Sequence, residues 1–165
     1  MSEGEGTGFN DAQSDYDVMR HITHIFVHCT AGPQTQTLAD LRAEFRRKGW
    51  KKPGYHYVVF PNGTVQQLLA EGKVANGVRG YNQTGIHVAY VGGIDAQGRA
   101  IDNRTEAQKE RLRSLLKLLH KRYPAASILG HRDISPDKNG NGRVDRWERI
   151  KECPCFDAME EYAGV

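Results

Sequence analysis

The sequence has little of what marks secreted, membrane-bound or disulfide-rich proteins. It contains three cysteines in 165 residues, too few for the disulfide framework of a small secreted domain. No apolar run reaches the roughly 18 residues that a membrane-spanning helix needs. Residues 1–6 are acidic and polar, so they lack the apolar core of a secretory signal. We therefore expect a protein without stable membrane association. It would work in the cytoplasm, stay there until it is released, or leave by a route that reads no such signal.

The charge pattern also argues against one large class of function. The formal net charge is +3, and no dense basic block is present, so nucleic-acid binding is not expected. A content of 38% hydrophobic and 26% charged residues is ordinary for a globular protein. The length fits one domain, which we expect to be a monomer. Residues 1–20 are rich in Gly, Ser and Asp and predict a flexible arm, which leaves 21–165 as the domain.

The order of predicted elements alternates strands with helices. Apolar periodicity, a capping box at Thr105–Gln108 and the turn Pro61-Asn62-Gly63 set the boundaries. The predicted strands span 22–29, 55–60, 64–68, 86–91 and 126–129, and the helices span 38–48, 105–122 and 156–162. This order predicts the α/β class, with a central mixed β-sheet flanked by α-helices.

Three residues of metal-ligating type stand out by local context. His28 lies near the end of a predicted strand, His131 follows an apolar run, and Cys153 opens a Cys-Pro-Cys-Phe-Asp segment. Two imidazoles and a thiolate are usual zinc ligands, and three protein ligands leave a fourth position for water. The three are far apart in the chain, so no compact motif supports them. A strand-end histidine can equally be a satisfied core residue.

Seven stretches, spread over about residues 22–160, together resemble one known family. They are Ile25–Ala31, Gly54–Val59, Asn62–Val65, Arg79–Asn82, Val91–Asp95, Gly130-His131 and Lys151–Asp157. Their types and order are similar to the type 2 N-acetylmuramoyl-L-alanine amidases, in particular the short bacteriophage lysozyme-type members, which belong with the peptidoglycan recognition proteins. The resemblance implies a hydrolase that acts on peptidoglycan or muropeptides.

The resemblance also implies a role for each matching residue. Zinc would bind His28, His131 and Cys153, since the Lys-x-Cys-Pro-x-Phe-Asp pattern selects Cys153 over Cys155. Tyr55 and Lys151 would be catalytic. The bond cut would be the amide between N-acetylmuramic acid and the first L-alanine of the stem peptide. Lys151 would face the developing oxyanion, and Tyr55 would orient water or pass a proton to the leaving amine.

Several biological settings fit this chemistry. A phage or prophage endolysin is the leading interpretation, with a wall-recycling amidase and an exported antibacterial effector as variants. A non-catalytic peptidoglycan-binding module is the alternative from another class, and the presence of Cys153 disfavours it. Two departures from the family pattern stand out: residues 76–78 lack an expected histidine, and His87 stands where small residues are usual.

A second metal site is predicted from residues 137–148. This segment matches the calcium-loop pattern D-x-[DN]-x-[DN]-G-x₅-E. The predicted ligands are Asp137, Asn139, Asn141, the backbone carbonyl of Arg143, Asp145 and Glu148. The alternative is a polar surface loop rich in Asn-Gly. If calcium binds, it would order the loop and so hold Lys151 and Cys153 in place.

Overall fold

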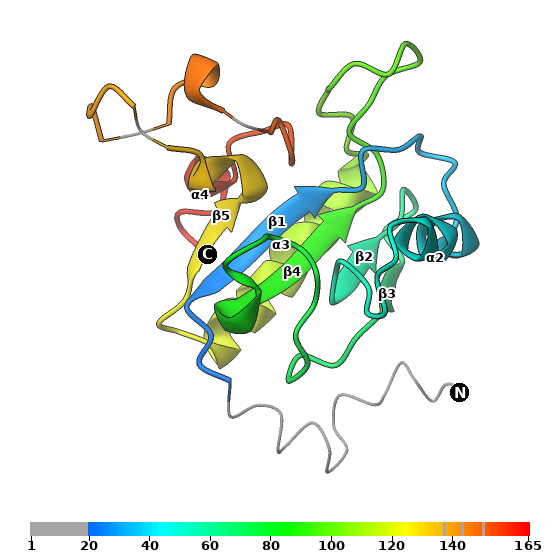
Figure 1. Cartoon of the computed structure of the whole chain (residues 1–165), viewed down its shortest axis with the longest axis horizontal. Coiled ribbons are helices and arrows are strands. Elements are labelled where there is room, and N and C mark those ends of the chain that lie inside the picture. The colour runs from blue at the N-terminus through cyan, green and yellow to red at the C-terminus, as the bar shows by residue number, and fades with distance from the viewer. Residues whose placement is uncertain (1–19, 137, 143, 150) are drawn as a thin grey trace.

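The computed structural model describes residues 20–165 except 137, 143 and 150. Among these residues, five strands form one mixed sheet in the order β3-β2-β4-β1-β5 (Figure 1). The strands are β1 (His24–Cys29), β2 (Tyr57–Val59), β3 (Val65–Gln67), β4 (Gly85–Tyr90) and β5 (Ser127–Gly130). β1 pairs in parallel with both β4 and β5, β4 pairs in parallel with β2, and β2–β3 is an antiparallel hairpin.

Two capped helices pack on the sheet. α2 (Leu38–Arg47) begins at Thr37 and α3 (Glu106–Arg122) begins at Thr105, each with a complete capping box that satisfies otherwise unpaired N–H groups of the first turn. A short helix, α4 (Ala158–Glu161), lies near the C-terminus. Single 3₁₀ turns are η2 (Asn82–Thr84), η3 (His131–Ile134) and η4 (Arg146–Glu148).

The two faces of the sheet differ because successive side chains of a strand point to opposite sides. One face carries the odd-numbered apolar residues of β1 and packs under α3, which runs behind the strands in Figure 1. The residues buried there include Ile25, Val27, Val88, Leu112 and Leu116. On the other face, Leu41 and Phe45 of α2 cover Val58 and Ala89. The remainder of that second face carries the ring side chains Phe26, His28 and His87.

The predicted fold class is confirmed. The predicted helices and strands are all present, with ends that differ by a few residues. The strands of the hairpin are shorter than predicted, so Tyr55 lies before β2 rather than within it. The predicted arm up to residue 19 lies outside the described residues, whereas Arg20 donates hydrogen bonds to the carbonyls of Gly72 and Asn82 at 3.1 Å each. No helix in the described part of the chain is long and apolar enough to cross a membrane.

Candidate metal centre

His28 is placed by the central strand of the sheet. β1 is paired along its length with β4, where His28 lies opposite Ala89, and with β5 as far as Val27, so the backbone of His28 is anchored in the sheet. The side chain is 2% exposed and lies on the face opposite α3. Its Nδ1 lies 3.7 Å from the sulfur of Cys153, and its Nε2 lies 2.9 Å from Nδ1 of His87. One nitrogen therefore faces the candidate site, while the other is paired inside the protein.

His131 directly follows β5, the strand beside β1. The turn η3 starts there, and Asp133 Oδ2 accepts a hydrogen bond from the N–H of Gly130 at 2.7 Å. A side chain at Gly130 would bring its Cβ within 2.5 Å of Pro154, so glycine permits the close approach of the C-terminal segment. The rings of His131 and His28 meet edge to face with centroids 5.1 Å apart. The carboxyl ends of parallel strands, where open α/β sheets bind ligands, thus supply both histidines.

Cys153 comes from the C-terminal loop that crosses these strand ends. Its sulfur accepts the N–H of Cys29 at 3.2 Å, and its carbonyl accepts the N–H of Arg132 at 2.8 Å. The side chain of Cys29 points elsewhere, as strand alternation predicts, and its sulfur lies 3.9 Å from that of Cys155. The loop is therefore tied to both β1 and η3, and these contacts select Cys153 as the thiol that faces the two histidines.

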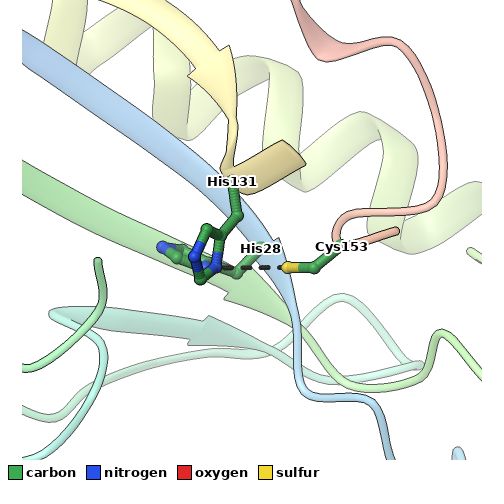
Figure 2. A group of neighbouring side chains, drawn as sticks. All are labelled: His28, His131 and Cys153. Atoms are coloured by element: carbon green, nitrogen blue, oxygen red, sulfur yellow. Dashed lines mark hydrogen bonds between the residues drawn. The ribbon is translucent and has the colours of Figure 1, made fainter. Parts of the chain in front are cut away.

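The three side chains fit a zinc ion. One ligand atom from each of His28, His131 and Cys153 lies within 4.8 Å of the others. In a tetrahedral site a zinc-bound nitrogen and sulfur are about 3.6 Å apart, close to the 3.7 Å between His28 Nδ1 and the Cys153 sulfur. Figure 2 shows the residues converging from β1, the end of β5 and the C-terminal loop. This nitrogen and sulfur donor set is the one that zinc prefers.

The electrostatics of the site keep both imidazoles neutral. Burial lowers the pKa of His28 well below its usual value, and the neighbouring His87 and His131 lower it further. Burial, with a smaller contribution from the Lys151 ammonium, lowers the pKa of His131 to about 4. A neutral imidazole has a free lone pair, which metal binding requires.

Tyr55 lies against the site from the segment just before β2. Its ring centroid is 5.3 Å from that of His28, and its hydroxyl donates to the carbonyl of Cys29 at 3.4 Å. Burial raises the pKa of Tyr55 well above its usual value, and the nearby Cys153 and Cys29 raise it further. The phenol therefore keeps its proton and can donate a hydrogen bond beside the three donors.

A cleft of about 520 Å³ opens beside His131. Lys151 lines both this cleft and the smaller pocket over His28, Tyr55 and Cys153, so it lies at the junction of the two. Lys48, Trp50 and Arg79 also line the cleft. No local sequence pattern identifies Lys48 or Trp50, which follow the end of α2. Arg79 belongs to a family-like stretch for which the resemblance implies no particular role.

The two departures from the family pattern meet at one place in the structure. Residue 77 is glycine, and a Cβ there would lie 2.2 Å from Nδ1 of His87. The His87 ring therefore fills the space that a side chain at position 77 would need. The two positions at which the sequence departs from the family pattern are thus in contact with each other, beside His28.

The predicted calcium loop is described in part. Asp137 and Arg143 lie outside the described residues. The side-chain amides of Asn139 and Asn141 donate to the Asp145 carboxylate at 2.9 and 2.8 Å. The Glu148 side chain is 2% exposed, and its carboxylate accepts the N–H of Asn139 at 3.0 Å and that of Asp145 at 2.7 Å. Hydrogen bonds therefore link the four predicted ligands that the structure describes.

Comparison with known proteins shows the family of this chain. The model of the N-acetylmuramoyl-L-alanine amidase family matches residues 18–154. The chain belongs to this family. The match contains His28, Tyr55, His131, Lys151 and Cys153, so the amidase pattern covers the whole candidate centre.

Phage endolysins are among the relatives of this amidase. The endolysin of Klebsiella phage KP32 is 34% identical over 148 residues, which cover 88% of this chain and 89% of the relative. The endolysin of Escherichia phage T7 is 36% identical over 135 residues, covering 81% and 80%. Among solved structures, the Ph2119 endolysin from a Thermus scotoductus bacteriophage has a TM-score of 0.61 at 28% identity, covering 81% of this chain and 77% of that one.

Proposed function

We propose that this amidase is a zinc-dependent endolysin of a phage or prophage, which cleaves the amide between N-acetylmuramic acid and L-alanine in peptidoglycan. The observation that carries the proposal is the convergence of His28, His131 and Cys153 beside an open cleft. Zinc, when bound, would polarise the amide carbonyl and lower the pKa of a coordinated water. A closed structural site would instead need a fourth protein ligand.

The neighbouring side chains supply the rest of the chemistry. Tyr55 keeps its proton because its pKa is raised by burial and then by the nearby cysteines, so its hydroxyl can hold the attacking water or donate to the leaving amine. Lys151 places an ammonium group at the mouth of the pocket, where it can stabilise the charge that develops on the carbonyl oxygen. His28 and His131 hold the metal as neutral ligands.

The cleft suits an anionic substrate. Lys48, Arg79 and Lys151 line it together with the Trp50 ring. Stem peptides carry free carboxylates, which pair with lysine and arginine side chains, while the tryptophan offers an apolar surface for a sugar or peptide segment. These contacts would place the scissile amide beside the metal centre.

Mass spectrometry of digested cell wall tests the bond that is cut. Purified sacculi treated with the zinc-loaded protein should release intact stem peptides from the sugar chains, with a new amino terminus at L-alanine. Release of disaccharides, or of peptides cut within the stem, would contradict the proposal. A non-catalytic binding module would sediment with sacculi but release nothing, so the same digest separates the two classes.

We also propose that calcium binds the 137–148 loop and so orders the segment that leads to Lys151 and Cys153. Support comes from the sequence pattern and from the gathering of Asn139, Asn141, Asp145 and Glu148. The Glu148→Gln variant should remove any calcium-dependent rise in melting temperature, and Glu160→Gln, at an exposed position, should leave it intact. If added calcium changes neither melting temperature nor activity of the unaltered protein, the calcium proposal is wrong.

Monomeric state and storage in the cytoplasm before release remain predictions. Sedimentation of the purified protein tests the first. A comparison of intact sacculi with soluble muropeptides as substrates would separate an endolysin from a wall-recycling amidase, because only the endolysin must act on the polymer.

A further inference from the structure

We propose that His87 is a positioning residue for the metal centre, which fixes the tautomer and the orientation of His28 by accepting its Nε2–H. This inference rests on the proposed zinc site and adds to it a residue that does not itself touch the metal. Partners of this kind orient metal-bound histidines and increase their affinity for the ion.

The argument starts from the two ring nitrogens of His28. Nδ1 lies 3.7 Å from the Cys153 sulfur and faces the site, whereas Nε2 lies 2.9 Å from Nδ1 of His87. A neutral imidazole carries one hydrogen. If Nδ1 binds the metal through its lone pair, the hydrogen is on Nε2 and must be donated to His87. Nδ1 of His87 is then an acceptor, and its own hydrogen is on Nε2.

The neighbours of the His87 ring hold it in one orientation. It is fully buried and is stacked between two other rings, with centroids 5.3 Å from Phe26 and 5.8 Å from His56. His56 is itself fixed, because its Nδ1 accepts the backbone N–H of His87 at 3.0 Å and its Nε2 donates to the carbonyl of Lys73 at 2.8 Å. The stack therefore holds the acceptor nitrogen opposite His28.

Two glycines shape the slot that the ring occupies. A Cβ at Gly77 would lie 2.2 Å from Nδ1 of His87, and one at Gly85 would lie 3.2 Å from Nε2. Only the absence of a side chain at position 77 lets Nδ1 reach its present place. Glycine at position 77 thus leaves room for the nitrogen of His87 that pairs with His28.

The other nitrogen of His87 argues against a role in stability alone. Within the described residues, Nε2 of His87 is buried without a hydrogen-bond partner. A buried N–H without an acceptor weakens a fold, and an apolar side chain at this position would avoid that loss. The only hydrogen bond that the described residues give this side chain is the one to His28.

The test uses two variants with side chains of the same branched shape, His87→Leu and His87→Asn. Only asparagine carries an oxygen near the position of the histidine Nδ1. Zinc affinity, measured by competition with a chelator, should fall about 10- to 100-fold in His87→Leu and recover most of that loss in His87→Asn. Melting of the metal-free proteins should give the opposite order, with the leucine variant the more stable.

A third variant reaches the same hydrogen bond without touching any histidine. Gly77→Ala should displace the His87 ring and weaken zinc binding, although every ligand is intact. Equal zinc affinity in His87→Leu and the unaltered protein would overturn the proposal. So would equal losses in the leucine and asparagine variants, since the effect would then be one of packing. If the unaltered protein itself binds no zinc, the proposed function fails together with this inference.

Discussion

The two faces of the central sheet serve different purposes, although the same strands build both. Under α3 the face is closed by leucines such as Leu112 and Leu116, which are fully buried against β1 and β4. The opposite face is covered by α2 only in part, and beside it three imidazoles, His28, His56 and His87, lie next to one another. Alternation along a strand thus lets apolar burial on one side support buried polar groups on the other.

The largest effect on the face that carries the histidines is expected when the thiolate is removed. Cys153→Ala should lower wall hydrolysis by at least about 1000-fold, because the chemistry that the metal supplies accounts for several kcal/mol of the barrier. Cys153 contacts the edge of the core under α3, but none of the buried leucines changes, so the metal-free protein should melt only slightly below normal. Turbidity loss of purified wall measures the hydrolysis, zinc content measures metal binding, and the melting temperature of the metal-free protein measures stability. Cys155→Ala is the matched control, and loss of zinc in that variant instead would show that the wrong cysteine was assigned.

The opposite result is expected from the α3 face. Leu116 is fully buried, and Leu116→Ala should reduce the free energy of unfolding by about 2–5 kcal/mol through lost contacts and a cavity. The folded fraction should still bind zinc and cleave wall at the normal rate. Denaturant unfolding measures the change, with Leu118→Ala, at a side chain 50% exposed, expected to stay within about 0.5 kcal/mol. A normal denaturation midpoint for Leu116→Ala would contradict the assignment of this face to stability.

A substitution at Tyr55 tests the sheet face that carries the candidate metal centre without removing a ligand. Tyr55→Phe should lower kcat by about 100-fold or more. Zinc affinity and melting temperature should stay near normal, because the single hydrogen bond of this hydroxyl within the described residues is a long one, 3.4 Å to the carbonyl of Cys29. Tyr81→Phe, at an exposed tyrosine, should keep full activity. Unchanged kcat in Tyr55→Phe would restrict the residue to a packing role.

The smallest effect is expected from Glu71, at the edge of the α3 face. Burial alone would raise the pKa of Glu71, but hydrogen bonds from Arg122, Tyr57 and Tyr123 outweigh it and hold that pKa below its ordinary value. A carboxylate with a lowered pKa stabilises the fold above its unfolded pKa, and this stability is lost as the pH falls through the folded value. Glu71→Gln should lower the free energy of unfolding by about 1–3 kcal/mol at neutral pH. Denaturant unfolding at a series of pH values should also show a smaller loss of stability toward acid pH. If Glu71→Gln loses stability at low pH as steeply as the unaltered protein does, the Glu71 carboxylate is not the source of that loss.

The sequence predicts the local structure well because its signals are local. Thr37, Thr105 and the Asn62-Gly63 turn fix the ends of helices and of the hairpin within a few neighbouring residues. The resemblance of short stretches to a family located the candidate ligands, and the structure brings them together. Both kinds of signal lie within about ten residues of the position that they predict.

The contacts that the sequence could not predict are those between distant segments. Parallel pairing sets Phe26 beside His87, and no local pattern announces it. The order of the strands likewise determines that Gly77 lies against His87. It also determines that residues up to 52 positions away enclose Glu71. The role of His87 therefore depends on neighbours that no local pattern reveals.

The separation of the three donors along the chain has a consequence for biosynthesis. Cys153 is 125 residues from His28, and β5 must dock beside β1 before His131 arrives. An ion therefore has no preformed cage in a nascent or partly collapsed polypeptide, since the contacts that create it have high contact order. Occupancy by metal would then report that the ribosome has released the entire domain and that its topology is complete.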